Sequence, residues 1–250
     1  LSPDAAPPTS FSLGIAAAPE LQKKVAEAAA FPILKIKLGA HARDGISHRE
    51  ILRTVRAAAP DKRLRIDPNE GWTLERAREH FAFLKTLPGP PIELCEQPLP
   101  ASDRAGLAAL FRDRDRPPIL LDESLIDARD LPGLVGLGDG VVVKLQKAGG
   151  ISGALEQITV ARSLGLTVFL GCMIESSVGI TAAAHLAPLC DYVDLDGHLL
   201  IADDPYSGVQ VEAGRLRLPG TSDGAQAQGR TRTSGRPGLG VLPAPALRAT

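Results

Sequence analysis

Several features that would point to export, a membrane or a nucleic acid are missing from this sequence of 250 residues. No apolar run reaches the roughly 18 residues needed to span a bilayer, so no membrane partner is expected. Residues 1–10 contain neither a basic region nor an apolar core, which argues against a signal peptide. The 28 basic and 29 acidic residues leave a formal net charge of −1, which gives no reason to expect binding to nucleic acid.

Cysteine is also scarce, and its spacing argues against a disulfide scaffold. Cys95, Cys172 and Cys190 form an odd set without a CxxC pair, which is typical of a reducing compartment, so a cytoplasmic location is expected. The five histidines show no metal-ligand spacing, and surface or core roles are expected for them. The chain begins with Leu1 rather than Met, which is the pattern of a piece of a longer protein.

What the sequence does contain is a repeated alternation of short aliphatic runs with longer stretches of helical periodicity. Eight strands alternating with helices imply parallel pairing, so we predict an α/β fold, a TIM-type (β/α) barrel with eight parallel strands. The alternative is a doubly wound open sheet, but no GxGxxG or GxxxxGK[ST] motif follows any strand. The expected strands are Ser10–Ile15, Ile33–Leu38, Arg63–Asp67, Ile92–Glu96, Ile119–Asp122, Val141–Leu145, Thr167–Cys172 and Tyr192–Leu195.

The alternating pattern ends near Leu199, and this sets the expected domain boundary. We predict a barrel domain over residues 1–204 and an irregular C-terminal segment over residues 205–250. Within that segment, residues 221–237 are rich in Gly, Ser, Arg and Gln and are predicted to form a loop or disordered tail.

An acidic residue ends each of the third, fourth and fifth predicted strands. Asp67, Glu96 and Asp122 are separated by 29 and 26 residues, about one β/α unit each, so they are expected at the same rim of the barrel. Three converging carboxylates repel one another unless a divalent cation lies between them, and oxygen-only ligation suits Mg²⁺. The alternative is that each acid only caps the helix that follows.

Lysines occupy the second and sixth predicted strands. Lys35 and Lys37 are two positions apart and therefore share a face, where each ammonium group is expected to lower the pKa of the other and so provide a base. Lys144 ends the sixth strand, which lies opposite the second in an eight-stranded barrel. Lys37 and Lys144 are therefore expected on opposite sides of a bound carbon atom. The alternative is that Lys35 and Lys37 lie on a solvent-exposed edge of a sheet, but a closed barrel has no such edge. Lys147 is expected in a loop.

A further acidic pair, Asp194 and Asp196, ends the eighth predicted strand. These residues are too far round the barrel to serve the metal, and paired carboxylates suit an ammonium group on a substrate. The alternative is that Asp194 and Asp196 have a structural role, in a turn or as a helix cap.

These residues resemble the enolase superfamily, in particular its muconate-lactonizing subgroup, over about residues 9–204. The resemblance implies that Asp67, Glu96 and Asp122 bind Mg²⁺. It further implies that Lys37 and Lys144 act as acid and base, that Lys35 tunes Lys37, and that the metal stabilises an enediolate. The stretches that carry it are Lys35-Ile-Lys37, Asp67-Pro-Asn69, Glu96-Gln-Pro98, Asp122-Glu-Ser124 and Lys144.

Within the subgroup, residues 171–176 and Asp194-Leu-Asp196-Gly are similar to the dipeptide epimerases. That resemblance implies an isomerase that epimerises a dipeptide, with the paired aspartates on its free amino group and Met173 lining the site. Muconate cycloisomerase or o-succinylbenzoate synthase chemistry is an alternative, and so is an inactive truncated barrel. The family's N-terminal capping domain is expected to be absent from this chain. A small-molecule substrate is expected, and a homo-oligomer stays possible.

Overall fold

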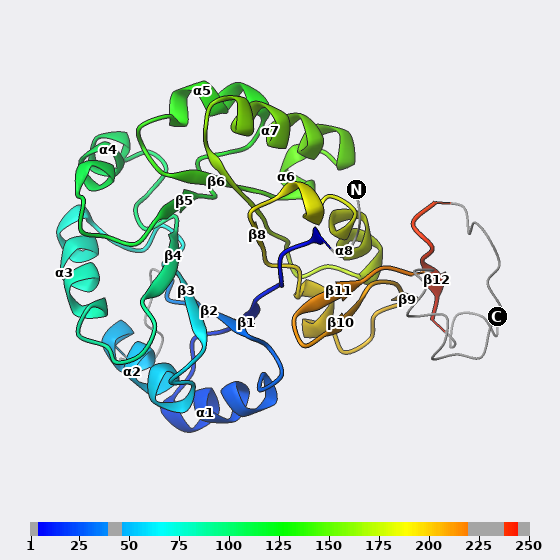
Figure 1. Ribbon diagram of the computed structural model, residues 1–250, viewed down its shortest axis with the longest axis horizontal. Coiled ribbons are helices and arrows are strands. Elements are labelled where there is room, and N and C mark those ends of the chain that lie inside the picture. Colours follow the sequence, from blue (N-terminus) through cyan, green and yellow to red (C-terminus); the bar gives the residue numbers. More distant parts are fainter. Residues whose placement is uncertain (1–4, 40–46, 220–237, 245–250) are drawn as a thin grey trace.

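The computed structural model describes residues 5–39, 47–219 and 238–244. Its centre is an eight-stranded sheet in which the strands lie in chain order and each neighbouring pair is parallel (Figure 1). The strands are β1 (Phe11–Leu13), β2 (Ile33–Lys37), β3 (Arg63–Asp67), β4 (Ile92–Glu96), β5 (Ile119–Leu121), β6 (Gly140–Val143), β7 (Thr167–Leu170) and β8 (Tyr192–Val193).

The sheet closes on itself where the chain enters β1. Thr9 forms a parallel bridge with Val193 of β8. The Ser10 amide donates to the Val193 carbonyl at 3.2 Å, and the Leu195 amide donates to Thr9 Oγ1 at 2.7 Å. The predicted TIM-type barrel is confirmed.

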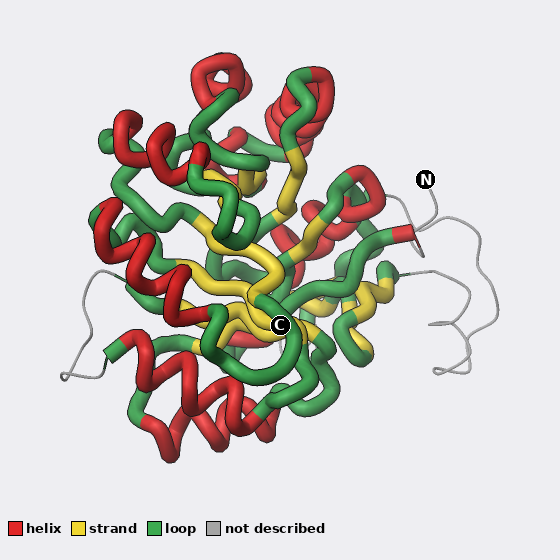
Figure 2. The backbone as a smooth tube through the Cα atoms, turned by 60° about the vertical axis from the view of Figure 1, so that its left-hand side comes forward, coloured by secondary structure: helices red, strands yellow, loops and turns green. Residues whose placement is uncertain are grey.

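Helices cover the outside of the strands (Figure 2). Ser47, Thr73 and Asp103 each accept a hydrogen bond from an amide in the first turn of the helix that follows, and so fix where these three helices begin. None of the helices in the described part of the chain is long and apolar enough to cross a membrane. The helices are α1 (Ala18–Glu27), α2 (His48–Ala58), α3 (Leu74–Leu84), α4 (Arg104–Arg112), α5 (Leu131–Leu134), α6 (Leu145–Ala148), α7 (Ile151–Ser163) and α8 (Ser177–Ala184).

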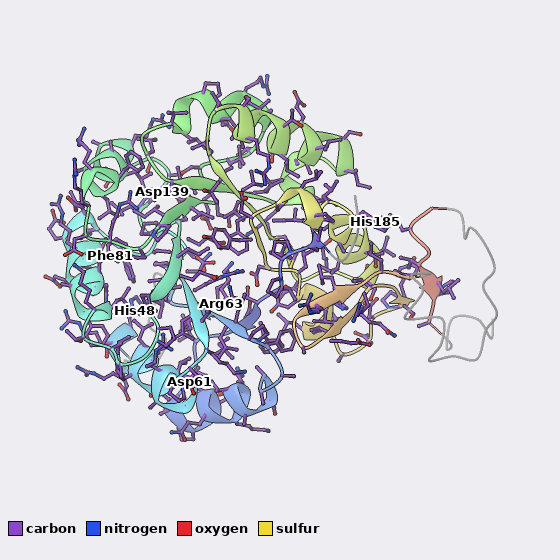
Figure 3. The ribbon with its side chains drawn as sticks, in the orientation of Figure 1. His48, Asp61, Arg63, Phe81, Asp139 and His185 are labelled. Atoms are coloured by element: carbon purple, nitrogen blue, oxygen red, sulfur yellow. The ribbon has the colours of Figure 1, made fainter. Side chains whose placement is uncertain are left out.

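Alternation along the strands separates two apolar layers. One residue in two packs outward against the helices, as Leu34, Ile66 and Leu121 do. The others form a separate cluster of Leu94, Leu120, Val142 and Phe169 with Tyr192 packed against it, and side chains crowd the interior of the ring in Figure 3. Glu96, Asp122 and Lys144 lie two residues beyond members of this inner cluster. The site therefore forms the next layer up the barrel.

Short antiparallel pairs follow the barrel, which the sequence pattern did not indicate. β10 (Gln210–Glu212) pairs with β11 (Arg215–Arg217), and β9 (Tyr206–Ser207) pairs with β12 (Leu242–Pro243). The predicted tail over residues 221–237 lies outside the described residues.

Candidate active site

The three acids predicted from the sequence lie at the carboxyl ends of adjacent strands. Asp67 and Glu96 are the last residues of β3 and β4, and Asp122 comes directly after β5. All three are at most 2% exposed. Burial of three neighbouring carboxylates is costly unless positive charge compensates it.

Lysine ammonium groups supply positive charge in this structure. Lys35 Nζ lies 2.6 Å from Glu96 Oε2 and 3.2 Å from Asp67 Oδ2. Lys37 Nζ lies 2.5 Å from the same Asp67 oxygen. The site is therefore a row of alternating charges, in which Lys35 joins the carboxylates of two neighbouring strands.

Lys144 approaches from the other side of the barrel. It lies one residue beyond β6, and its Nζ is 2.6 Å from Asp122 Oδ2. β2 and β6 are four strands apart in an eight-stranded ring. Lys37 and Lys144 therefore reach the rim from opposite strands, and each pairs with a different carboxylate.

Lys147 is a member of this network, so its expected place in a loop is wrong. It lies on α6, whose single turn was not predicted, and its Nζ bonds both the carboxylate and the backbone carbonyl of Asp122. The spacing of three residues from Lys144 was the available signal, because residues three apart share a helix face.

The chemistry of the three strand-end carboxylates is that of a metal site. Among the residues that the structure describes, no group of three His, Cys, Asp or Glu side chains is already arranged to hold an ion, because the lysines lie between the acids. Both carboxylate oxygens of Glu96 are buried without a hydrogen-bond partner, and only Oε2 has an ion pair, with Lys35, among the described residues. Burial and the negative charge of Asp67 raise the pKa of Glu96 to about 8, although Lys35 opposes the rise. An all-oxygen set with an unpartnered, buried carboxylate fits a hard divalent cation.

Gln97 was not singled out from the sequence, yet it holds two of these acids in register. Its side-chain Oε1 accepts hydrogen bonds from the Asp122 amide at 2.9 Å and from the Ser124 amide and hydroxyl at 3.2 and 3.1 Å. Its Nε2 donates to the Leu99 carbonyl at 2.9 Å. Gln97 thus ties the end of β4 to the end of β5. Its place in the Glu96-Gln-Pro98 stretch was the available signal in the sequence.

The electrostatics of Lys35 differ from the prediction. Burial alone lowers the pKa of this lysine, but Asp194, Glu96 and Asp67 outweigh burial and raise it well above the ordinary value. The expectation that the pKa of Lys35 is lowered is therefore wrong. Lys144 behaves in the same way: burial opposes its charge, but Glu96 and Asp122 raise its pKa.

Asp194 comes directly after β8, Asp196 follows two residues later, and both are buried at the same rim. Asp194 Oδ2 lies 3.0 Å from Lys35 Nζ, so this pair is connected to the acids of β3 and β4 rather than separate from them. Asp196 Oδ2 accepts a hydrogen bond from the Ser12 amide at 2.6 Å. Burial and the negative charge of Asp194 raise the pKa of Asp196 to about 7. A cationic group placed beside Asp196 would offset both effects.

Met173 lies on the loop between β7 and α8, beside this acidic pair. The residue is 42% exposed, and its backbone carbonyl packs so closely on Gly197 that a Cβ there would come within 2.1 Å of it. Gly197 directly follows Asp196. The close approach therefore holds the Met173 loop next to the acids.

A ring cluster supports the loop that follows Asp67. Trp72 is 2% exposed, its Nε1 donates to His48 Nδ1 at 3.0 Å, and its ring stacks on His80 with 4.4 Å between centroids. His48, labelled in Figure 3, begins α2. Burial lowers the pKa of His48, and burial together with the charge of His48 lowers the pKa of His80 to about 4. The fold therefore favours the neutral form of both imidazoles.

Comparison with known proteins gives consistent matches. The family model described as enolase C-terminal domain-like matches residues 17–246. An L-Ala-D/L-amino acid epimerase of Pedosphaera parvula (strain Ellin514) is 46% identical over 209 residues, which are 83% of this chain and 58% of that protein. An L-Ala-D/L-Glu epimerase of Bacteroides thetaiotaomicron is 35% identical over 220 residues, 87% of this chain and 55% of that protein.

Solved structures give the same family. The dipeptide epimerase from Enterococcus faecalis V583, crystallised with Mg and L-Leu-L-Tyr, has a TM-score of 0.77 at 33% identity and covers 86% of this chain and 62% of that one. The chain thus spans a little over half the length of the curated relatives named above. The barrel, its strand-end acids and lysines, and these matches together show that the chain belongs to the enolase C-terminal domain-like family of the enolase superfamily.

Proposed function

We propose that this chain is the barrel of a Mg²⁺-dependent isomerase that epimerises a dipeptide by removing and returning the proton on an α-carbon. The observation that carries the proposal is the placement of Lys37 and Lys144. They come from strands four apart, and each pairs with a different strand-end carboxylate. Inversion of a carbon requires one group on each of its faces, and this pair supplies two.

Asp67, Glu96 and Asp122 are the residues proposed to hold the metal ion. When bound, a divalent cation supplies positive charge that stabilises the negative charge developing on the substrate carboxylate as the α-proton leaves. The buried Glu96 oxygens, which lack hydrogen-bond partners, and the raised pKa of Glu96 support this assignment, because added positive charge would relieve both.

The two lysines are proposed to move the proton. The Nζ of one, as the free amine, takes the α-proton from its face of the substrate, and the Nζ of the other, as the ammonium, delivers a proton to the opposite face. Lys35 is buried and held by three carboxylates, so it is a fixed charge rather than a mobile one. Its proposed role is to set the electrostatic environment of Lys37, with which it shares Asp67.

Asp194 and Asp196 are proposed to bind the free amino group of the dipeptide, with Met173 beside it. Asp196 supports this role because burial and the negative charge of Asp194 raise its pKa, and an ammonium group beside it would oppose both effects. The relatives named as dipeptide epimerases support the substrate class. Cycloisomerase and synthase substrates carry no ammonium group, so they give this pair no partner.

Exchange of the α-proton with solvent tests the proposal. The protein is incubated with Mg²⁺ and, separately, with each of the two epimers of a dipeptide in heavy water, and deuterium at the α-carbon is followed by NMR. We expect wash-in with the wild type, none with Lys37→Ala from at least one epimer, and full wash-in with Lys23→Ala, which removes an exposed lysine on α1. Full exchange by Lys37→Ala from both epimers would show that Lys37 is not an acid or base.

A further inference from the structure

Ser10 lies at the closure of the barrel, where the chain enters β1. It is completely buried, and its amide bonds the carbonyl of Val193, the residue before Asp194. Its hydroxyl donates to Asp194 Oδ1 at 2.6 Å. The same hydroxyl accepts a hydrogen bond from Arg65 Nη1 at 3.1 Å. Ser10 therefore stands between a buried cation and a buried acid.

Arg65 fixes the direction of this hydroxyl. The guanidinium is 1% exposed and cannot accept a hydrogen bond, so the contact with Ser10 must use an oxygen lone pair. The hydroxyl proton is then left to point at Asp194. Arg65 is itself held rigidly, since Nη1 also donates to the Val193 carbonyl at 2.7 Å and Nε bonds Glu93 Oε2 at 2.5 Å. Its guanidinium lies 5.0 Å from the centre of the Phe169 ring.

Asp194 has few other restraints among the described residues. Its second oxygen pairs with Lys35, and Lys35 shares its ammonium group with Glu96 at a shorter distance, 2.6 Å against 3.0 Å. A carboxylate held through one oxygen can rotate, whereas one held through both has a fixed plane. The bond from Ser10 is therefore what sets the orientation of Asp194, while Lys35 keeps its place through Glu96 and Asp67 without it.

From these contacts we propose that Ser10 is a positioning residue for substrate binding: directed by Arg65, it fixes the carboxylate of Asp194 in the orientation that receives the substrate's ammonium group. The inference rests on the proposed function, in which Asp194 binds that group. It predicts an effect on the binding of the substrate rather than on the transfer of the proton, because among the described residues neither Ser10 nor Asp194 makes a hydrogen bond or ion pair with Lys37 or Lys144.

The test is Ser10→Ala, which removes the hydroxyl with almost no change in volume. Loss of a hydrogen bond to a charged group is expected to raise KM for the dipeptide about 10-fold or more, with kcat changed less than about 3-fold. Thr181→Val is the matched control, because it removes an equally buried hydroxyl whose hydrogen bonds within the described part of the chain are to Ser177 and Val209. The control is expected to leave KM unchanged. Ser10→Cys, which keeps the bulk, replaces Ser10→Ala if the alanine variant does not fold.

A crystal structure of the Ser10 variant gives a readout that does not depend on turnover. We expect the Asp194 carboxylate to rotate while Lys35 stays between Glu96 and Asp67. An unmoved Asp194, an unchanged KM, or a fall in kcat at constant KM would each overturn the role of Ser10. If the wild type itself shows no α-proton exchange, the proposed function fails, and the position of Asp194 in the variant still decides whether Ser10 orients it.

Discussion

Replacing Gln97 by methionine removes the side chain that ties the end of β4 to the end of β5 while keeping its volume nearly constant. Two fully buried groups lose their hydrogen bonds, the Asp122 amide and the Leu99 carbonyl. At about 1–3 kcal/mol for each buried group left without a partner, the free energy of unfolding should fall by about 2–6 kcal/mol. The bonds to Ser124 are partly exposed, so water replaces them at little cost.

Urea unfolding measures this loss, with Gln157→Met as the control. Gln157 is equally buried, at 1% exposure, but makes a single hydrogen bond, to the Ile126 carbonyl, and its Oε1 has no partner. Its replacement should therefore cost about 1 kcal/mol or less. If the two variants unfold at the same urea concentration with the same slope, Gln97 does not hold the site together as the structure indicates.

Three further outcomes are expected. The pKa values of His48 and His80 lie below the ordinary histidine value, so the unfolded chain takes up protons first as the pH falls. Their contribution to stability is therefore present above about pH 6.5 and is lost as the pH falls towards 4. His80→Gln should make the melting temperature less dependent on pH in this window, and an unchanged pH dependence would show that His80 is not its source. Mg²⁺ should raise the melting temperature of the wild type, and Glu96→Gln should reduce that rise at least several-fold, as measured by a Mg²⁺ titration in differential scanning fluorimetry. An equal rise in the wild type and the variant would exclude Glu96 as a metal ligand. Asp196→Asn should weaken the binding of a dipeptide by about 10-fold or more while leaving the binding of its N-acetylated form unchanged, as measured by calorimetry. An equal loss of affinity for the two ligands would show that Asp196 does not bind the amino group.

The fold was predictable because its signals are local. Each strand is a short aliphatic run, and the acids Asp67, Glu96 and Asp122 recur at about one β/α unit, so their common height follows from the chain alone. The two-residue spacing of Lys35 and Lys37 likewise predicts a shared face. Closure of the barrel then brings these acidic and basic side chains together at one rim.

The parts that the sequence did not reveal depend on contacts between distant segments. Ser10 and Asp194 are separated by 184 residues, and they meet only because the barrel closes between β1 and β8. The raised pKa of Lys35 has the same origin, since its three carboxylate partners come from β3, β4 and the end of β8. The role of Gln97 was hidden because an amide side chain carries no signal until its partners are known.

The origin of the proton at each face of the α-carbon tests the central claim most directly. Lys37→Ala and Lys144→Ala are each incubated in heavy water with Mg²⁺ and the two epimers of one dipeptide, and deuterium wash-in is compared. If the lysines act on opposite faces, each variant loses inversion but keeps exchange from one epimer, and the two variants keep it from different epimers. Retention of exchange from the same epimer in both variants would contradict the account.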